Sequence, residues 1–519
     1  MARLRVQVLA AFGVMLCGLV LVANARSPNE NLARGVQALE AHDFAAAQQV
    51  FSLLVKQHPS AANYGYLAMA EVGEGNLKQA VADFKKSIQL GGSSASIHYN
   101  LGLAYLEDHQ PQAAIQEFQQ AISLDSNYIP ARYALGVTFL NFGQARKAVA
   151  CFAEARKVAP YDPRIWANLV KAQFEAGESK EAIDTAEDAM QAVPNDARLA
   201  VTLATICIHH QQIQAARNLL EDANELMADN QEVRLLLAKA SLMAGEPVEA
   251  LAVLKGMTQG SDESGEKLLL MGEARALTGN LNAAAADVMA ALKESPGNVQ
   301  YLATYAWLQQ LQQHYTDALA TLAKARALEP QVAFLPYRMG VSYYFLGQLQ
   351  QAEKACEEAL QLSPQYAAAY LLLGIIKFQR KDFQGAESNF RKAVRLNPSE
   401  ALFHRELGVT LLEQGKAAEA RKQLDVALAM DPKDAEGYFW RAKLLAGQGA
   451  RREAIADLKS AVELKPDYSE AYTELAKRYT EDGQPQQAAC AIEAQKRIKA
   501  SSNPAAQDQL LKNLPDALR

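Results

Sequence analysis

Apolar residues recur every three or four positions along most of this chain, in short runs that are broken at regular intervals. The stretch Ile129–Asp162 shows this most clearly, with apolar side chains at Leu135, Phe139 and Leu140 before Gly143. This spacing is typical of an amphipathic helix, and glycine suits the left-handed conformation in which helices often end. The pattern predicts one helix ending near residue 143 and a second helix starting near residue 145.

The same pattern repeats with a fixed period. When Ile129 is taken as position 1 of a frame, position 20 is alanine in fourteen consecutive frames, and every step between these alanines is 34 residues except the first, which is 33. The alanines are Ala47, Ala80, Ala114, Ala148, Ala182, Ala216, Ala250, Ala284, Ala318, Ala352, Ala386, Ala420, Ala454 and Ala488. Prolines at Pro111, Pro247 and Pro485 all fall at position 17, where the first amide of a helix needs no partner. A period of this length predicts a solenoid of helical hairpins.

Small residues mark the place where the two helices of each hairpin should cross. Position 8 is glycine in seven frames and alanine in six, and only Val170 departs from this rule. We expect position 8 to face the alanine at position 20, so that the helices approach to about 8 Å. A leucine at either position would force the helices apart.

The combined pattern resembles the tetratricopeptide repeat, from about Pro28 to Ala500. Besides positions 8 and 20, the matching features are an aromatic residue or leucine at position 24, alanine at position 27 and proline at position 32. The resemblance implies an all-α fold, an α-solenoid of about fourteen helix-turn-helix repeats that forms a right-handed superhelix. It also implies a concave groove, lined by the first helices, that binds peptides or partner domains.

The repeats leave no room for a separate globular domain. We expect repeats 1 to 7 in residues 28–264, repeats 8 to 14 in residues 265–502, and a capping helix or a partner-binding tail in residues 503–519. Two stretches rich in glycine and serine, Gly91–Ser94 and Gly256–Gly265, keep the period and are interpreted as longer loops rather than hinges.

Residues 1–25 lie outside the repeats and have the pattern of a secretory signal. Two arginines precede the uncharged apolar run Val6–Val22, and an A-x-A motif predicts cleavage after Ala25. A lipoprotein signal at Cys17 is disfavoured because Leu16 stands where such signals carry a small residue. The pattern predicts a periplasmic or secreted protein, with an anchor formed by an uncleaved segment as the alternative.

The composition and the motifs do not predict catalysis, a cofactor or a nucleic-acid partner. The formal net charge is -6, and the clustered basic residues that phosphate binding requires are missing. His209 and His210 are adjacent, so they point about 100° apart on a helix and are poorly placed to share a metal ion. The remaining cysteines lie in separate repeats, too far apart for disulfides, and are expected to be buried free thiols: Cys151, Cys207, Cys356 and Cys490.

The resemblance places the groove at positions 2, 5, 6, 9, 12 and 13 of the first helices. In three consecutive repeats these positions carry a strip of large apolar side chains: Trp307, Phe334, Tyr337, Tyr344, Phe345, Leu371, Ile375 and Phe378. Aromatic side chains dominate the energetics of interfaces, so the strip is a candidate binding surface. The alternative is that its rings fill gaps between neighbouring first helices.

Charged residues occupy the groove positions elsewhere, and Arg164 and Lys171 are candidates for pairing with an acidic or C-terminal carboxylate ligand. The lysine and asparagine pattern of the family's carboxylate clamp is missing. Only Asn100 and Asn168 match the asparagine ladder that some members use to hold a peptide backbone.

The function expected from the sequence is a non-catalytic scaffold that binds one or more proteins. The alternatives are an accessory component of a polysaccharide or pilus export machine, where the contact could be a glycan, and a subunit that positions a separate enzyme.

Overall fold

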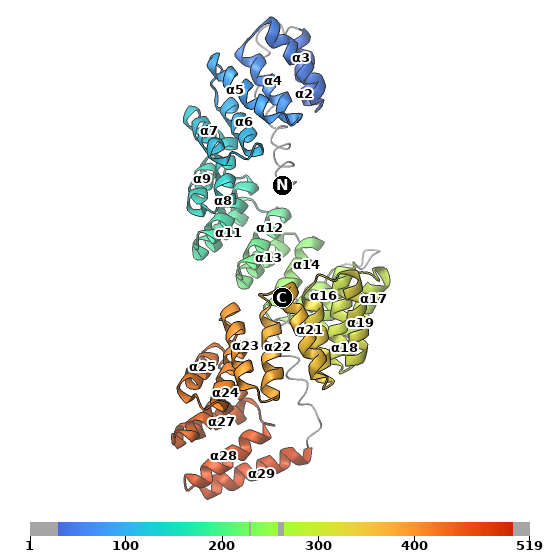
Figure 1. Cartoon of the computed structure of the whole chain (residues 1–519), viewed down its shortest axis with the longest axis vertical. Coiled ribbons are helices and arrows are strands. Elements are labelled where there is room, and N and C mark those ends of the chain that lie inside the picture. Colours follow the sequence, from blue (N-terminus) through green and yellow to red (C-terminus); the bar gives the residue numbers. More distant parts are fainter. Residues whose placement is uncertain (1–29, 228–229, 258–263, 502–519) are drawn as a thin grey trace. The chain divides into compact units, whose positions relative to one another are not determined.

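A computed structural model describes residues 30–227, 230–257 and 264–501 (Figure 1). Within these three ranges the regular structure consists of 28 α-helices, with no strand. The all-α solenoid of paired helices expected from the period is therefore confirmed.

The helices, in chain order, are α2 (Glu30–Glu40), α3 (Phe44–Gln57), α4 (Ala61–Gly73), α5 (Leu77–Gln89), α6 (Ala95–Glu107), α7 (Pro111–Leu124), α8 (Ile129–Asn141), α9 (Ala145–Val158), α10 (Pro163–Glu175), α11 (Ser179–Ala192), α12 (Ala197–His209), α13 (Ile213–Leu226), α14 (Gln231–Met243), α15 (Pro247–Lys255), α16 (Gly265–Leu277), α17 (Leu281–Glu294), α18 (Val299–Leu311), α19 (Tyr315–Leu328), α20 (Phe334–Phe345), α21 (Leu349–Leu362), α22 (Ala367–Gln379), α23 (Phe383–Leu396), α24 (Ala401–Glu413), α25 (Ala417–Met430), α26 (Ala435–Gly447), α27 (Arg451–Leu464), α28 (Ser469–Glu481) and α29 (Pro485–Ser501).

Local sequence sets the ends of these helices. Gly143 adopts φ +67° between α8 and α9, as expected for a residue that ends a helix. Pro111, Pro247 and Pro485 each open a second helix, which confirms the phase of the repeat. Several first helices start after a residue whose side chain accepts a hydrogen bond from an amide of the first turn; Ser94 does this for α6, so the stretch Gly91–Ser94 is a capped loop between repeats.

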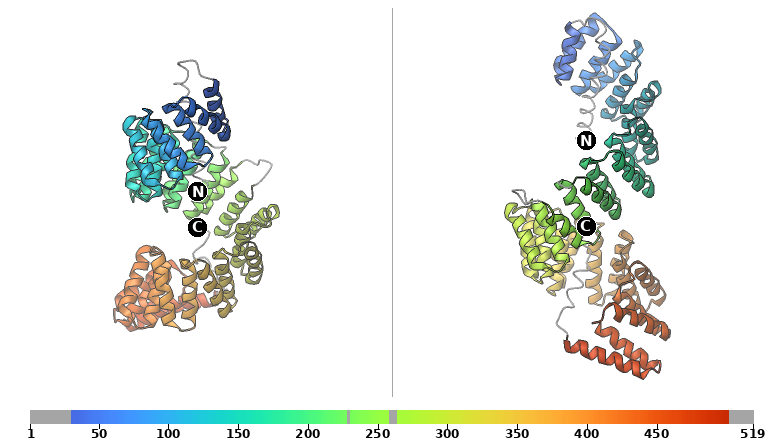
Figure 2. Two further views of the ribbon diagram at one scale, coloured as in Figure 1. Left: turned by 45° about the horizontal axis from the view of Figure 1, so that its top comes forward. Right: turned by 180° about the vertical axis from the view of Figure 1, so that it is seen from behind.

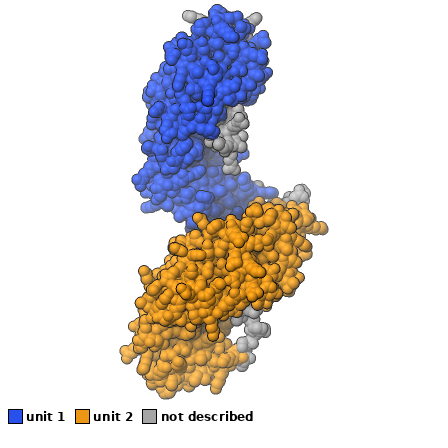
Figure 3. Space-filling view, in the orientation of Figure 1, with its two compact units in different colours: residues 1–244 blue, residues 245–519 orange. Residues whose placement is uncertain are grey.

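The chain divides into two compact units, residues 1–244 and residues 245–519 (Figure 3). Within each unit, first helices (even numbers) and second helices (odd numbers) alternate along the chain as stacked hairpins (Figure 2). In the first unit a core cluster runs from Leu39 to Ala172, and in the second unit a core cluster from Leu269 to Leu444 is larger than the neighbouring clusters of that unit. Each core is continuous from repeat to repeat, as a solenoid requires.

The glycine at position 8 makes room for position 24 rather than for the alanine side chain at position 20. A Cβ atom added at Gly136 would lie 2.7 Å from the Phe152 ring, and one at Gly374 would lie 2.4 Å from the Phe390 ring. The residue at position 20 faces position 8 with its backbone: the carbonyl oxygen of Ala420 would be 3.3 Å from a Cβ added at Gly408. The expected close crossing is present, but the ring at position 24 fills the space.

The four cysteines of the repeats are free, as expected. Cys207 and Cys356 are buried and Cys151 is partly buried, whereas Cys490 is exposed on α29. The expectation of four buried thiols is therefore wrong for Cys490.

The sequence-predicted signal in residues 1–25 and the tail in residues 503–519 lie outside the described residues. Within the part of the chain that the structure describes, no helix combines the length and the apolar character needed to cross a membrane.

Candidate partner-binding surface

Two rings of the predicted strip belong to the core. Tyr337 is 1% exposed and Trp307 is 6% exposed, and both lie in the larger core cluster of the second unit. Tyr337 occupies position 5 of its repeat, where the ring of Tyr366, at position 34, packs edge-on against it with centroids 5.2 Å apart. The prediction that these two rings form a binding surface is corrected: both close gaps between neighbouring helices.

The other rings of the strip reach solvent. Tyr344, Phe345 and Phe378 are partly exposed and pack with one side against the same core cluster. Ile375 and Leu412 share this environment. We call these five side chains, on α20, α22 and α24, the aromatic surface. Phe334 is also partly exposed, but it packs against a separate cluster, and Leu371 is buried.

The repeat itself aligns the aromatic surface. Tyr344, Phe378 and Leu412 all occupy position 12 in three consecutive repeats. Equivalent residues of stacked first helices point the same way and lie about one helix diameter, ~10 Å, apart. Phe345 stacks on Tyr315 with ring centroids 5.1 Å apart, which fixes the end of α20 against α19, the second helix of the preceding repeat. The side chains are thus held in place by packing on one side and open on the other.

Carboxylates crowd around one buried cation beside the aromatic surface. The side chain of Arg405 on α24 is only 7% exposed and contacts three acids, which we call the acidic cluster: Glu406 at 3.0 Å, Asp434 at 3.0 Å and Glu436 at 3.2 Å. A second cation, Lys465, lies 3.9 Å from Glu436. The cluster joins α24 to the start of α26.

The acidic cluster shapes the titration of its neighbours. Burial alone would lower the pKa of Arg405, but Glu406, Asp434 and Glu436 hold that pKa above its ordinary value. Burial raises the pKa of Glu406 even though Arg405 opposes this effect. Burial also raises the pKa of Tyr344, and the charge of Glu406 adds to the shift, which places Tyr344 within electrostatic reach of the cluster. The aromatic surface and the acidic cluster also share α24, which carries both Leu412 and Glu406.

The acidic cluster was not predicted from the sequence, although the sequence contains a signal for it. In three repeats an aromatic residue at position 5 packs against a tyrosine at position 34 of the same repeat: Tyr99 with Tyr128, Tyr337 with Tyr366 and Phe439 with Tyr468. Arg405 and Asp434 occupy the same two positions, so an ion pair replaces the ring pair there. Arg405 is also the one charged residue at position 5 in all fourteen frames of the sequence.

The basic candidates lie in the first unit, apart from the aromatic strip in the chain. Arg164 pairs with Asp162 at 2.7 Å and lies over the ring of Tyr133, and Lys171 is 3.8 Å from Glu175. An open depression at the starts of α10 and α12 is lined by Arg164 and Arg198 but also by Asp162 and Asp196. Both aspartates accept hydrogen bonds from helix amides, so the charges at this depression are balanced.

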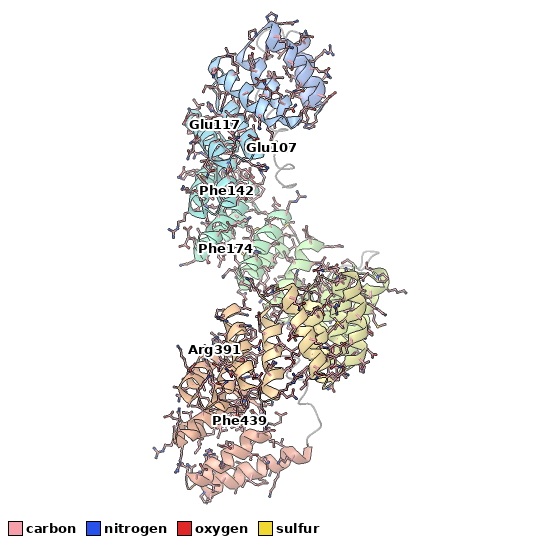
Figure 4. The ribbon with its side chains drawn as sticks, in the orientation of Figure 1. Glu107, Glu117, Phe142, Phe174, Arg391 and Phe439 are labelled. Atoms are coloured by element: carbon pink, nitrogen blue, oxygen red, sulfur yellow. The ribbon has the colours of Figure 1, made fainter. Side chains whose placement is uncertain are left out.

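The histidine pair on the same unit has a packing role. The ring of His210 stacks on Phe174, labelled in Figure 4, with centroids 4.7 Å apart and planes 8° apart. Burial lowers the pKa of His210, and His209 adds to the shift. Among the described residues, no group of three or more side chains could hold a metal ion.

A buried carboxyl pair in the first unit should make its stability depend on pH. Glu71 on α4 and Asp83 on α5 are both buried, and burial, with the charge of Asp83, raises the pKa of Glu71 to about 8. The folded state therefore binds a proton that the unfolded state has already released. Stability should fall as pH rises between the ordinary glutamate pKa and about 8, by up to about 1.4 kcal/mol per pH unit.

Urea denaturation of the Glu71→Gln variant at about pH 6 and about pH 9 tests this expectation. The variant should lose most of the difference between the two pH values that the unchanged protein shows. Glu74→Gln, an exposed neighbour just after α4, is the matched control and should leave the difference intact. An unchanged pH dependence in Glu71→Gln would contradict the assignment.

The paired helices, the small residues at their crossings and the continuous cores define the class of α-helical repeat proteins. One tetratricopeptide repeat model matches residues 66–129, 337–401, 378–435 and 405–469, and a second matches residues 105–173, 142–206 and 208–266. Together these matches cover more than half of the chain. The chain therefore belongs to the tetratricopeptide repeat family, which supports a role as a scaffold for protein–protein interactions.

Solved structures are similar along the repeats. Cut9–Hcn1, an APC/C hetero-tetramer, is 16% identical over 95% of this chain and 98% of that chain, with a TM-score of 0.44. Yeast Tom70 is 17% identical over 80% of this chain and 94% of that chain, with a TM-score of 0.41. YrrB, described as a TPR protein with an unusual peptide-binding site, is 23% identical over 37% of this chain and 98% of that chain, with a TM-score of 0.30. A search of curated protein sequences gives no significant match.

Proposed function

We propose that this protein is a non-catalytic scaffold that binds a protein partner through the aromatic surface of its second unit. The observation that carries the proposal is a row of large apolar side chains at position 12 of three consecutive repeats, Tyr344, Phe378 and Leu412. All three are partly exposed, although the fold does not require a large apolar residue at an exposed position. Large rings held by packing on one side lose little entropy when a partner covers the other side.

The proposal includes export. The apolar run and the A-x-A motif in residues 1–25 support a secretory signal, so the repeats would act in the periplasm or outside the cell. Fusion of residues 1–25 to a reporter enzyme that is active only after export tests this part by itself. Reporter activity that stays in the cytoplasmic fraction would contradict it.

Photocrosslinking in cells tests the binding surface directly. A crosslinking amino acid at Tyr344 should trap a discrete protein, which mass spectrometry can identify. The control places the same amino acid at Glu357, an exposed residue of the second helix α21. Equal capture at both positions, or no capture at Tyr344, would contradict the proposed surface.

Removal of two rings should weaken partner binding with little effect on folding. The double variant Tyr344→Ala with Phe378→Ala should bind the identified partner about tenfold more weakly or worse, because aromatic anchors dominate interface energetics. Isothermal titration calorimetry measures the affinity, and a thermal melt measures the fold. Leu396→Ala, which removes an exposed apolar side chain from the second helix α23, is the control and should bind normally.

The melting temperature of the double variant can be compared with that of a variant that lacks a buried ring. Tyr337→Ala removes a ring that is 1% exposed and should lower the melting temperature strongly. If the Tyr344→Ala with Phe378→Ala variant melts as early as Tyr337→Ala, its rings are core residues and the binding proposal is wrong.

A further inference from the structure

The charge that a ligand meets beside the aromatic surface is negative. The side chain of Arg405 is 7% exposed, whereas the side chains of Glu406 and Glu436 are 23% and 34% exposed. Arg405 therefore lies deeper than Glu406 and Glu436, which are the more exposed members of the acidic cluster. One further acid, Glu413, is exposed at the end of α24, seven residues after Glu406 and so on a similar face of the helix.

The neighbouring cations do not cancel this charge. Lys377 on α22 and Arg380, just after α22, both bind Glu353, at 2.7 Å and 2.6 Å, and Lys377 also lies 4.0 Å from Asp382. On α26, the ammonium group of Lys443 lies 4.1 Å from the centroid of the Trp440 ring. Lys377 and Arg380 are thus balanced by Glu353 and Asp382, and Lys443 lies over a neutral ring rather than in an ion pair with the acidic cluster, while Arg405 and Lys465 together face three carboxylates.

The aromatic surface and the acidic cluster follow one another along the stacked first helices. The position 12 row ends at Leu412 on α24, the same helix that carries Glu406, and the acidic cluster continues to Glu436 at the start of α26. An extended chain lying along the stacked first helices would meet apolar side chains over α20 and α22 and then carboxylates over α24 and α26.

From this arrangement we infer that the partner segment is a peptide with apolar side chains next to a lysine or arginine, whose cation binds Glu406 and Glu436. The inference rests on the proposed function, because it assigns a ligand chemistry to the same surface. A cation placed there would gain an interaction with two carboxylates that share one guanidinium, in a partly desolvated position where such pairs are strongest.

Three synthetic peptides with identical leucine and phenylalanine positions and with lysine, glutamine or glutamate at the remaining positions serve as probes. Fluorescence anisotropy measures their binding to the full chain, to the Tyr344→Ala with Phe378→Ala variant and to Glu436→Gln. The lysine peptide should bind about tenfold more tightly than the glutamine peptide, and this advantage should shrink as salt is raised. Glu436→Gln should reduce the advantage, whereas Glu463→Gln, an exposed acid on the second helix α27, should preserve it.

The outcomes separate the two proposals. If binding depends on Tyr344 and Phe378 but the glutamine or glutamate peptide binds as tightly as the lysine peptide, the inferred chemistry is wrong and the proposed surface stands. If none of the three peptides shows binding that depends on Tyr344 and Phe378, both are wrong. If Glu436→Gln fails to fold, the unchanged protein still tests the inferred ligand chemistry. Salt should weaken the preference of the unchanged protein for the lysine peptide over the glutamine peptide, and a preference that salt does not weaken would overturn the inference.

Discussion

Replacing Arg405 by methionine is expected to destabilise the second unit by about 3 to 5 kcal/mol. The substitution keeps most of the apolar volume of the side chain but leaves Glu406, Asp434 and Glu436 without the guanidinium that each contacts within 3.2 Å. Carboxylates that remain partly buried without a cation must either bind protons or repel one another. Urea denaturation measures the loss, and hydrogen exchange should locate it in α24 and α26.

A surface arginine on the next helix provides the control. Arg421 on α25 pairs with Asp425 one turn later, and both side chains are well exposed. Such pairs contribute less than about 1 kcal/mol, so Arg421→Met should change stability little. Adding Glu436→Gln to Arg405→Met should recover part of the loss, since fewer carboxylates are left uncompensated. An Arg405→Met variant as stable as Arg421→Met would show that the cluster contributes no net stability.

The repeated features of the fold could be predicted from the sequence because each depends on local chemistry. Proline at Pro111 can begin a helix and glycine at Gly143 can end one, whatever the rest of the chain does. The alanines at position 20 and the small residues at position 8 fix the phase because a hairpin with a close crossing tolerates few alternatives. Fourteen copies of the same constraints leave little freedom to the architecture.

The exposure of single groove residues could not be predicted in the same way. Tyr337 and Tyr344 are seven residues apart, so helical geometry alone puts both on one face of α20. Tyr366, which belongs to the loop before the next first helix, covers Tyr337 and not Tyr344. The difference depends on a contact between positions 5 and 34 of one repeat, and the helical periodicity of α20 alone does not contain it. The same holds for Arg405, whose partner Asp434 stands 29 residues later.

The second large effect concerns the crossing of α22 and α23. Gly374→Leu is expected to destabilise the second unit by about 3 kcal/mol or more, because a Cβ atom alone would come within 2.4 Å of the Phe390 ring. Phe390 is fully buried and has no free space into which it could move. The hairpin must open, and the two neighbouring repeats lose contacts with it. Urea denaturation measures the stability, and hydrogen exchange should rise first in α22 and α23.

Intrinsic helix preference favours replacing this glycine, so it opposes the steric cost. A loss of stability in a Gly374 variant can therefore be assigned to the contact with the Phe390 ring. Replacing a helical glycine by alanine favours the helix by up to about 1 kcal/mol where the side chain meets nothing. Gly447, the last residue of α26, has open space around an added Cβ, so Gly447→Ala should be neutral or stabilising. Gly374→Ala should be destabilising despite the same gain in helix preference, and Phe390→Leu should relieve part of its cost, since another repeat already combines alanine at position 8, Ala442, with leucine at position 24, Leu458. If Gly374→Ala stabilised the protein as Gly447→Ala does, the ring at position 24 would not be what requires glycine at position 8.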